Sequence, residues 1–188
     1  MDSNFLASLL VVPPVILGVP LRPFCCGHAV LLEAIESPFL RGGEITRDEL
    51  IVAAWICART FEDGRDQLVG DREKLLKDCE AWGATVGAWD FDATSAAFQV
   101  YLSLHLKAPE KWKSKDSKSC RAPWPLTIAT GMMMNLGLSE SHAWNMPMQA
   151  ALWYFASIAE ANGDESLITE QERQRMKLAK EMAVQNGD

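Results

Sequence analysis

Thiol and imidazole groups come closest together in the sequence at Cys25-Cys26-Gly27-His28. Such groups are the usual ligands of zinc, and a cysteine activated by a histidine can act as a nucleophile. A structural zinc site needs four ligands, which usually come in pairs spaced as C-x2-C, but these two cysteines are adjacent and no second pair follows at a useful spacing. The pattern therefore favours a loop at the start of a helix, with buried thiols, over a metal site.

The other cysteines and histidines give no stronger sign of a nucleophile. Cys57 ends the apolar run Ile51–Cys57, and His105 lies in an apolar stretch typical of a partly buried helix residue. A reactive thiolate needs an electropositive setting, which the sequence does not provide around these residues or around His142. We therefore predict no catalytic cysteine.

Acidic side chains cluster at residues 62–66, 90–92 and 164–165, where they could ligate calcium or magnesium. None of these clusters matches the calcium-loop pattern D-x-[DN]-x-[DN]-G with its closing glutamate. Each lies where a helix is expected to begin or end, so turn and cap chemistry accounts for it. The sequence also lacks the phosphate-binding glycine patterns and the H-E-x-x-H motif. We predict no metal, no cofactor and no catalytic residue, and expect a protein that is not an enzyme.

Composition and net charge argue against several classes of partner. The 188 residues carry a formal net charge of −7, and 48% of them are hydrophobic. Such acidity disfavours nucleic acid and anionic membranes as partners. The uncharged run Phe5–Leu21 is shorter than the roughly 20 residues of a membrane-spanning helix and is interrupted by prolines. The five cysteines, an odd number without paired spacing, fit a reducing cytosol, so we expect a cytoplasmic protein.

Helices are the elements expected to position these residues, about six in all, in a single mostly helical domain of the all-α class. Thr46-Arg47-Asp48-Glu49 is a capping box, which begins an apolar helix that we expect to run to about Thr60. The other expected helices are Phe24–Ile35, Arg65–Cys79, a helix capped by Asp92 that ends near Lys107, Pro125–Asn135 with Gly137 as its left-handed stop, a short turn capped by Ser139, Pro147–Gly163, and a polar helix that begins with the capping box 169–172.

Four segments follow from this pattern. Residues 1–21 form an apolar N-terminal arm, and short strands within 11–21 stay open as an alternative because prolines are tolerated at sheet edges. Residues 22–106 form a helical subdomain, 107–121 a basic exposed loop, and 122–188 a C-terminal helical subdomain packed on the first. The loop has six basic and two acidic side chains, a net charge of +4, which is weak for nucleic-acid binding. A homo-oligomer formed through the arm also stays open.

Between Ala122 and Glu172 the chain has no Lys or Arg, whereas Trp and Met residues crowd together. A segment of this kind either buries itself or holds an apolar surface of another protein, because methionine packs against apolar partners of many shapes. Both interpretations stay open for each residue. The candidate contact residues are Met132, Met133, Met134, Trp144, Met148, Leu152, Trp153 and Phe155.

Two segments of the chain resemble proteins of bacteriophage tails. The first contains Leu21–Phe24, Gly27-His28, Leu31–Glu33 and Ser37–Phe39, followed by the helix at 48–59, and it resembles small proteins encoded in phage and prophage tail regions. The second contains Leu136–Ser139, Ala143–Pro147 and Ala151–Trp153, and ends at Gly163-Asp164. It is similar to a helix pair of phage tail assembly chaperones, the small proteins made just upstream of the tape-measure protein.

The resemblance implies a non-enzymatic helical protein of the bacterial host cytoplasm. It would hold an apolar protein client, such as the tape-measure protein, before the tail tube polymerises. The chain departs from many of these chaperones in that nothing in it indicates their longer, frameshifted form. Two alternatives stay open: a structural component of a phage particle, such as a tail or head-tail protein, and a small helical enzyme of unknown reaction.

Overall fold

The computed structural model describes residues 12, 14–70, 72–110, 122–163, 167–168 and 170–185. Their 10 helices and single two-stranded sheet confirm the all-α class in its broad form, whereas the expected count of about six helices is wrong. Most of the N-terminal arm, the basic loop from residue 111 to 121 and the cap residue Thr169 lie outside the described residues. The elements are β1 (Val15–Ile16), β2 (Val19–Pro20), α2 (Cys26–Ala34), α3 (Pro38–Arg41), α4 (Arg47–Cys57), α5 (Phe61–Gly70), α6 (Arg72–Thr85), α7 (Phe91–His105), α8 (Trp124–Leu136), α9 (Glu140–Asn145), α10 (Met148–Ala161) and α11 (Glu170–Gln185).

The predicted capping box of α4 is present. The backbone N of Glu49 donates to Thr46 Oγ1 at 3.3 Å, and the backbone N of Thr46 donates to Glu49 Oε2 at 2.7 Å. The helix ends at Cys57, before the expected Thr60, because Thr60 begins the next helix: its Oγ1 accepts from the backbone N of Asp63 at 3.2 Å. This second cap is one reason why the helix count was too low.

Two more boundaries correct the expectations from the sequence. The expected helix over Arg65–Cys79 is two helices, α5 and α6, with a break between Gly70 and Arg72. The cap of α7 is Asp90 and not Asp92, because Asp90 Oδ1 accepts from the backbone N of Ala93 at 3.1 Å. In both places several neighbouring charged or polar residues could each have begun the helix, so the sequence did not decide between them.

The short strands left open for residues 11–21 are present as an antiparallel hairpin. Ile16 pairs with Val19, and the two residues between them have positive φ angles, 51° at Leu17 and 76° at Gly18. Positive φ at both positions matches the right-handed twist of a tight hairpin, but it is unfavourable for leucine. The side chain of Leu17 is buried in the core, which offsets that cost.

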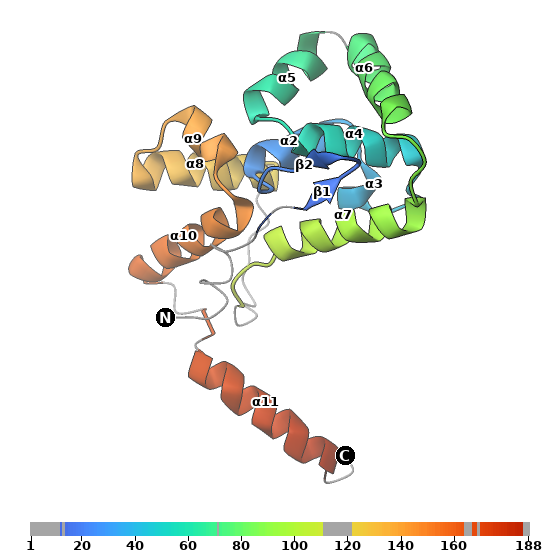
Figure 1. Ribbon diagram of the computed structural model, residues 1–188. Helices are drawn as coiled ribbons and strands as arrows, with labels where there is room; N and C mark the ends of the chain where they lie inside the picture. Colours follow the sequence, from blue (N-terminus) through green and yellow to red (C-terminus); the bar gives the residue numbers. More distant parts are fainter. Residues whose placement is uncertain are drawn as a thin grey trace.

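Helix α2 lies at the centre of the molecule, where it contacts α3, α4, α5, α8 and α9 (Figure 1). Helices α5 and α6 lie on one side of α2 and α4, and α7 lies on the other. Helices α8, α9 and α10 form a group of their own beside α2. The largest fully buried side chains come from the group α8–α10 and from the group formed by the rest of the helices. They include Phe24, Leu32, Leu50, Ile56, Phe98, Tyr101, Met132 and Met148.

The two groups are joined by backbone contacts between the residues before α2 and those before α10. Cys25 forms a β-bridge with Pro147, and the backbone N of Met148 donates to the carbonyl of Phe24 at 2.7 Å. We call this contact the 25–147 joint. It fixes the start of α10 against the start of α2, so the two groups share one core.

Gly27 allows close packing next to the 25–147 joint. A Cβ atom at this position would lie 2.5 Å from Cβ of Phe61, far inside contact distance. The ring of Phe61 stacks on Trp144 with centroids 4.9 Å apart, and its backbone N donates to Asn145 Oδ1 at 3.0 Å. Phe61 therefore cannot move away from a larger residue 27 without disturbing α9.

Replacing Gly27 with alanine should destabilise the protein by about 1–3 kcal/mol, because the added methyl group overpacks the contact with Phe61. Gly70→Ala is the matched control, since no atom lies within 4 Å of a Cβ built there. Urea unfolding followed by circular dichroism gives both free energies of unfolding. Equal free energies for the two variants would contradict the packing role of Gly27.

Helix α11 extends away from the rest of the molecule (Figure 1). Its start is tied to the segment after α7, because the backbone N of Ile168 donates to the carbonyl of Glu110 at 3.0 Å and Arg173 Nε lies 3.1 Å from Glu110 Oε2. Beyond this start, Met176, Leu178 and Met182 are exposed. Most of the stability of a helix in a protein comes from packing of its apolar side. These three side chains give α11 an apolar surface that the described residues leave uncovered.

Candidate functional site

The cluster Cys25-Cys26-Gly27-His28 is buried at the start of α2. Cys25 caps the helix, because its Sγ accepts from the backbone N of His28 at 3.5 Å, whereas Sγ of Cys26 lies 3.9 Å from Sδ of Met148 in α10. The two thiols thus contact different partners. Among the described residues, no group of three or more His, Cys, Asp or Glu side chains is placed to hold a metal ion.

The buried thiols are in an environment that opposes ionisation. Burial raises the pKa of Cys25 and of Cys26 to about 12, and burial also raises the pKa of Cys57. A nucleophilic cysteine needs the opposite shift, toward neutral pH, as produced by a nearby cation or a helix N-terminus. These thiols therefore serve as small apolar side chains that help to fill the core.

Three polar rings lie in the same region of the core. Nε2 of His28 donates to the carbonyl of Arg59 at 2.8 Å, Nδ1 of His105 donates to the carbonyl of Tyr101 at 2.9 Å, and the Tyr101 hydroxyl donates to the carbonyl of Arg22 at 2.8 Å. In the described part of the chain, the second ring nitrogen of each histidine has no hydrogen-bond partner. These bonds hold the loop carbonyls of Arg22 and Arg59 to the core and the His105 ring to its own helix, α7. All three rings are buried, so none is open to a substrate.

The candidate contact residues are divided between the core and the surface. Met132, Trp144 and Met148 are buried, so a partner cannot reach them without a rearrangement of the fold. Leu152, Trp153 and Phe155 of α10 and Met133 of α8 are partly buried, and Met134 is 80% exposed. Contact with a partner stays a prediction for the residues that reach the surface.

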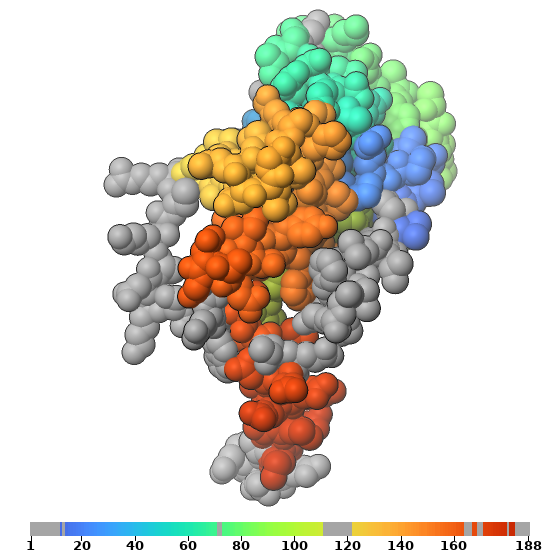
Figure 2. Space-filling view, turned by 90° about the vertical axis from the view of Figure 1, so that its left-hand side faces the viewer, coloured from blue at the N-terminus to red at the C-terminus, as the bar shows by residue number. Residues whose placement is uncertain are grey.

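Helices α8 and α10 carry further exposed apolar side chains that the sequence did not single out. The two helices pack tightly against each other: a Cβ atom on Gly131 would lie 2.7 Å from the ring of Phe155. Figure 2 shows this side of the molecule, with α8, α9 and α10 in yellow to orange. We use the name α8–α10 face for the outer surface of these two helices; its exposed apolar residues are Trp124, Leu126, Met134, Leu136 and Tyr154, and Met133 and Phe155 are partly buried.

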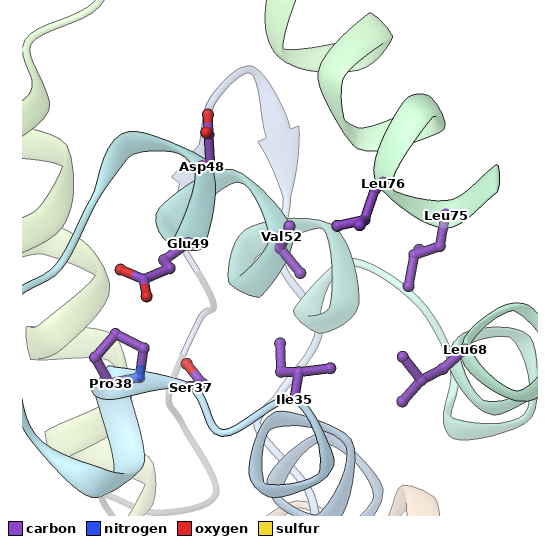
Figure 3. A pocket seen from close by; sticks show the side chains of 9 residues that line it. All are labelled: Ile35, Ser37, Pro38, Asp48, Glu49, Val52, Leu68, Leu75 and Leu76. Carbon is purple, nitrogen blue, oxygen red and sulfur yellow. The ribbon is translucent and has the colours of Figure 1, made fainter. Parts of the chain in front are cut away.

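A second feature is a hollow of about 170 Å³ bounded by α2, α3, α4, α5 and α6 (Figure 3). Ile35, Val52, Leu68, Leu75 and Leu76 give it an apolar lining, and Ser37, Pro38, Asp48 and Glu49 complete it. Of its three leucines only Leu75 is fully buried, whereas Leu76 is exposed. The sequence could not reveal the hollow, because its walls come from five separate elements.

The buried position of His28 makes the stability of the fold depend on pH. Burial lowers the pKa of His28 to about 4 from 6.5, so between these values the unfolded chain binds more protons than the native one. The free energy of unfolding should fall by about 3 kcal/mol from this group as the pH decreases from 6.5 to 4. The pKa of His105 is also lowered by burial, which adds a loss of the same sign.

Urea unfolding of His28→Gln across this pH range measures the effect, since glutamine can still donate to Arg59 but does not titrate. We expect a shallower loss of stability toward acid in this variant than in the natural chain. Gln99→Ala, which changes an exposed, non-titrating side chain of α7, is the control and should keep the pH dependence of the natural chain. An identical pH dependence in all three proteins would contradict a buried neutral His28.

Comparisons with protein-family models, with curated proteins and with solved structures find no match for this chain. Within the described residues, no helix has both the length and the apolar character needed to cross a lipid bilayer. The case for a function therefore depends on the surfaces of the chain itself.

Proposed function

We propose that this chain is a non-enzymatic, protein-binding chaperone of the phage tail assembly type. In this proposal the α8–α10 face holds an apolar segment of a client, such as a tape-measure protein, in the cytoplasm of the bacterial host. The single observation that carries the proposal is the exposed aromatic and methionine side chains on a pair of helices whose other side already fills the core.

The chemistry of the α8–α10 face suits an apolar protein client. No Lys or Arg occurs between Ala122 and Glu172, so the face offers no cation to a phosphate backbone or to an acidic ligand. Methionine and aromatic side chains can repack around apolar segments of different shapes. The acidic residues Glu140 and Glu160 border these helices and help to keep a loaded complex in solution.

The rigid support beneath this face also favours binding. Met132 and Met148 are fully buried directly under it, and Met148 is held by the 25–147 joint through its backbone N. A face on a fixed support loses little conformational entropy when a client binds, which leaves more of the contact energy for affinity. The buried candidates thus position the exposed ones.

Co-expression with a candidate tape-measure protein from the same genome tests the proposal. The natural chain should keep that protein in the soluble fraction and co-purify with it. Met134→Lys, which places a cation at an exposed position of the face, should lower the recovered complex at least about ten-fold, since desolvating the charge against an apolar client is costly.

The matched control is Val100→Lys on α7, because Val100 is also an exposed apolar residue but belongs to neither α8 nor α10. It should yield as much complex as the natural chain. Equal loss in both variants would locate binding elsewhere, and no complex with the natural chain would refute the proposal. Detection of the chain in purified virions by mass spectrometry would instead favour a structural component of the particle.

A further inference from the structure

Two surfaces outside the α8–α10 face are apolar, accessible and complementary in charge. One is the hollow between α2 and α6, and the other is the outer part of α11. Each is of a kind that proteins usually cover, because exposed leucine and methionine side chains gain free energy when they leave water. Their chemistry indicates what covers them.

The hollow combines an apolar wall with an acidic end. Leu68, Leu75 and Leu76 lie on one side of it, and Ser37, Pro38 and Glu49 lie on the other (Figure 3). Asp48 also belongs to the lining, although its carboxylate points away from the hollow in Figure 3, and the nine described residues that line the hollow include no cation. A ligand with an aliphatic group beside a positive charge would match both sides.

Ser37 adds an independent sign that this end of the hollow is incomplete. Its side chain is buried, and its hydroxyl has no hydrogen-bond partner among the described residues. Although Ser37 is at the cap position of α3, it makes no capping hydrogen bond. Buried hydroxyl groups normally have a hydrogen-bond partner. The Ser37 hydroxyl in the wall of the hollow could therefore accept a hydrogen bond from a donor group of a bound partner.

Helix α11 presents a stripe with the complementary pattern. Arg175, Leu178 and Met182 are spaced i, i+3 and i+7, so they lie on the same side of the helix. Leu178 and Met182 are 59% and 61% exposed, and Arg175 is exposed as well. A cation therefore stands one turn before an exposed leucine.

We propose that α11 of one copy of this chain docks into the hollow of a second copy. Leu178 enters the hollow against Leu68, Leu75 and Leu76. A volume of about 170 Å³ is close to that of an apolar cavity that binds a benzene-sized group, so one leucine side chain fits. Arg175 then meets the carboxylate of Glu49.

The arrangement of the chain makes this contact intermolecular. Helix α11 extends from one end of the molecule, and α5 and α6 lie at the opposite end in both views (Figures 1 and 2). The helix therefore cannot reach the hollow of its own chain in this structure. A contact between two different surfaces adds further copies in a row or a ring, or closes into a dimer when two copies exchange their α11 helices reciprocally.

Sedimentation of the full chain over a concentration series tests this inference. The contact is small, so we expect weak association, with a dissociation constant on the order of 100 µM, and an average mass that rises with concentration above that of a monomer. Leu178→Glu on α11 and Leu76→Lys at the rim of the hollow should each leave a monomer. Glu49→Gln, which keeps the capping box, should weaken association about three-fold.

Mixing the two monomeric variants gives the decisive result. Leu178→Glu retains an intact hollow and Leu76→Lys retains an intact helix, so an equimolar mixture should form one-to-one dimers and nothing larger. Val69→Lys, at an exposed position of α5 outside the hollow, is the control and should associate like the natural chain. Melting temperatures of all variants establish that each is folded.

Three results would overturn the inference: a full chain that stays monomeric throughout the series, association that survives Leu178→Glu, or a mixture of folded variants that stays monomeric. None of these outcomes bears on client binding at the α8–α10 face, which involves other residues.

Discussion

The 25–147 joint is the constraint on which the rest of the structure depends. It brings together two parts of the chain that are far apart in sequence: Cys26 and Met148, which touch beside it, are 122 residues apart. The joint uses backbone hydrogen bonds, so it fixes the direction of α10 as well as its position. Gly27 then lets Phe61 stack on Trp144, which sets α5 and α9 around the same point.

The residues with the most reactive side chains serve this architecture. Cys25 caps α2, Cys26 contacts α10, and His28 binds a loop carbonyl from the end of α4. Burial holds the thiols protonated and the imidazole neutral, the states in which they can stay inside a core at low cost. The same burial makes the fold sensitive to acid. Cysteine and histidine residues that are close together in sequence thus indicate a reactive site only where their environment brings the pKa values toward neutral pH.

Local signals in the sequence predicted much of the helical framework. The capping box at Thr46, the left-handed Gly137 and the restart of the chain at Pro147 each act within a few residues, and all three are present. Met132 and Met134 could not be told apart in this way: they are two positions apart on one helix, and only the location of α2 and α10 decides that the first is buried and the second exposed. The hollow was equally hidden, since it exists only when five elements come together.

The Lys- and Arg-free segment has a buried half, which holds the fold, and an exposed half, which we propose binds a client. Methyl NMR of the chain labelled at methionine tests this division most directly, because Met132 and Met148 are internal controls for Met133 and Met134. On addition of a tape-measure fragment, the Met133 and Met134 signals should shift or broaden while those of Met132 and Met148 stay in place. Equal changes at all four, or changes confined to the buried pair, would contradict the account.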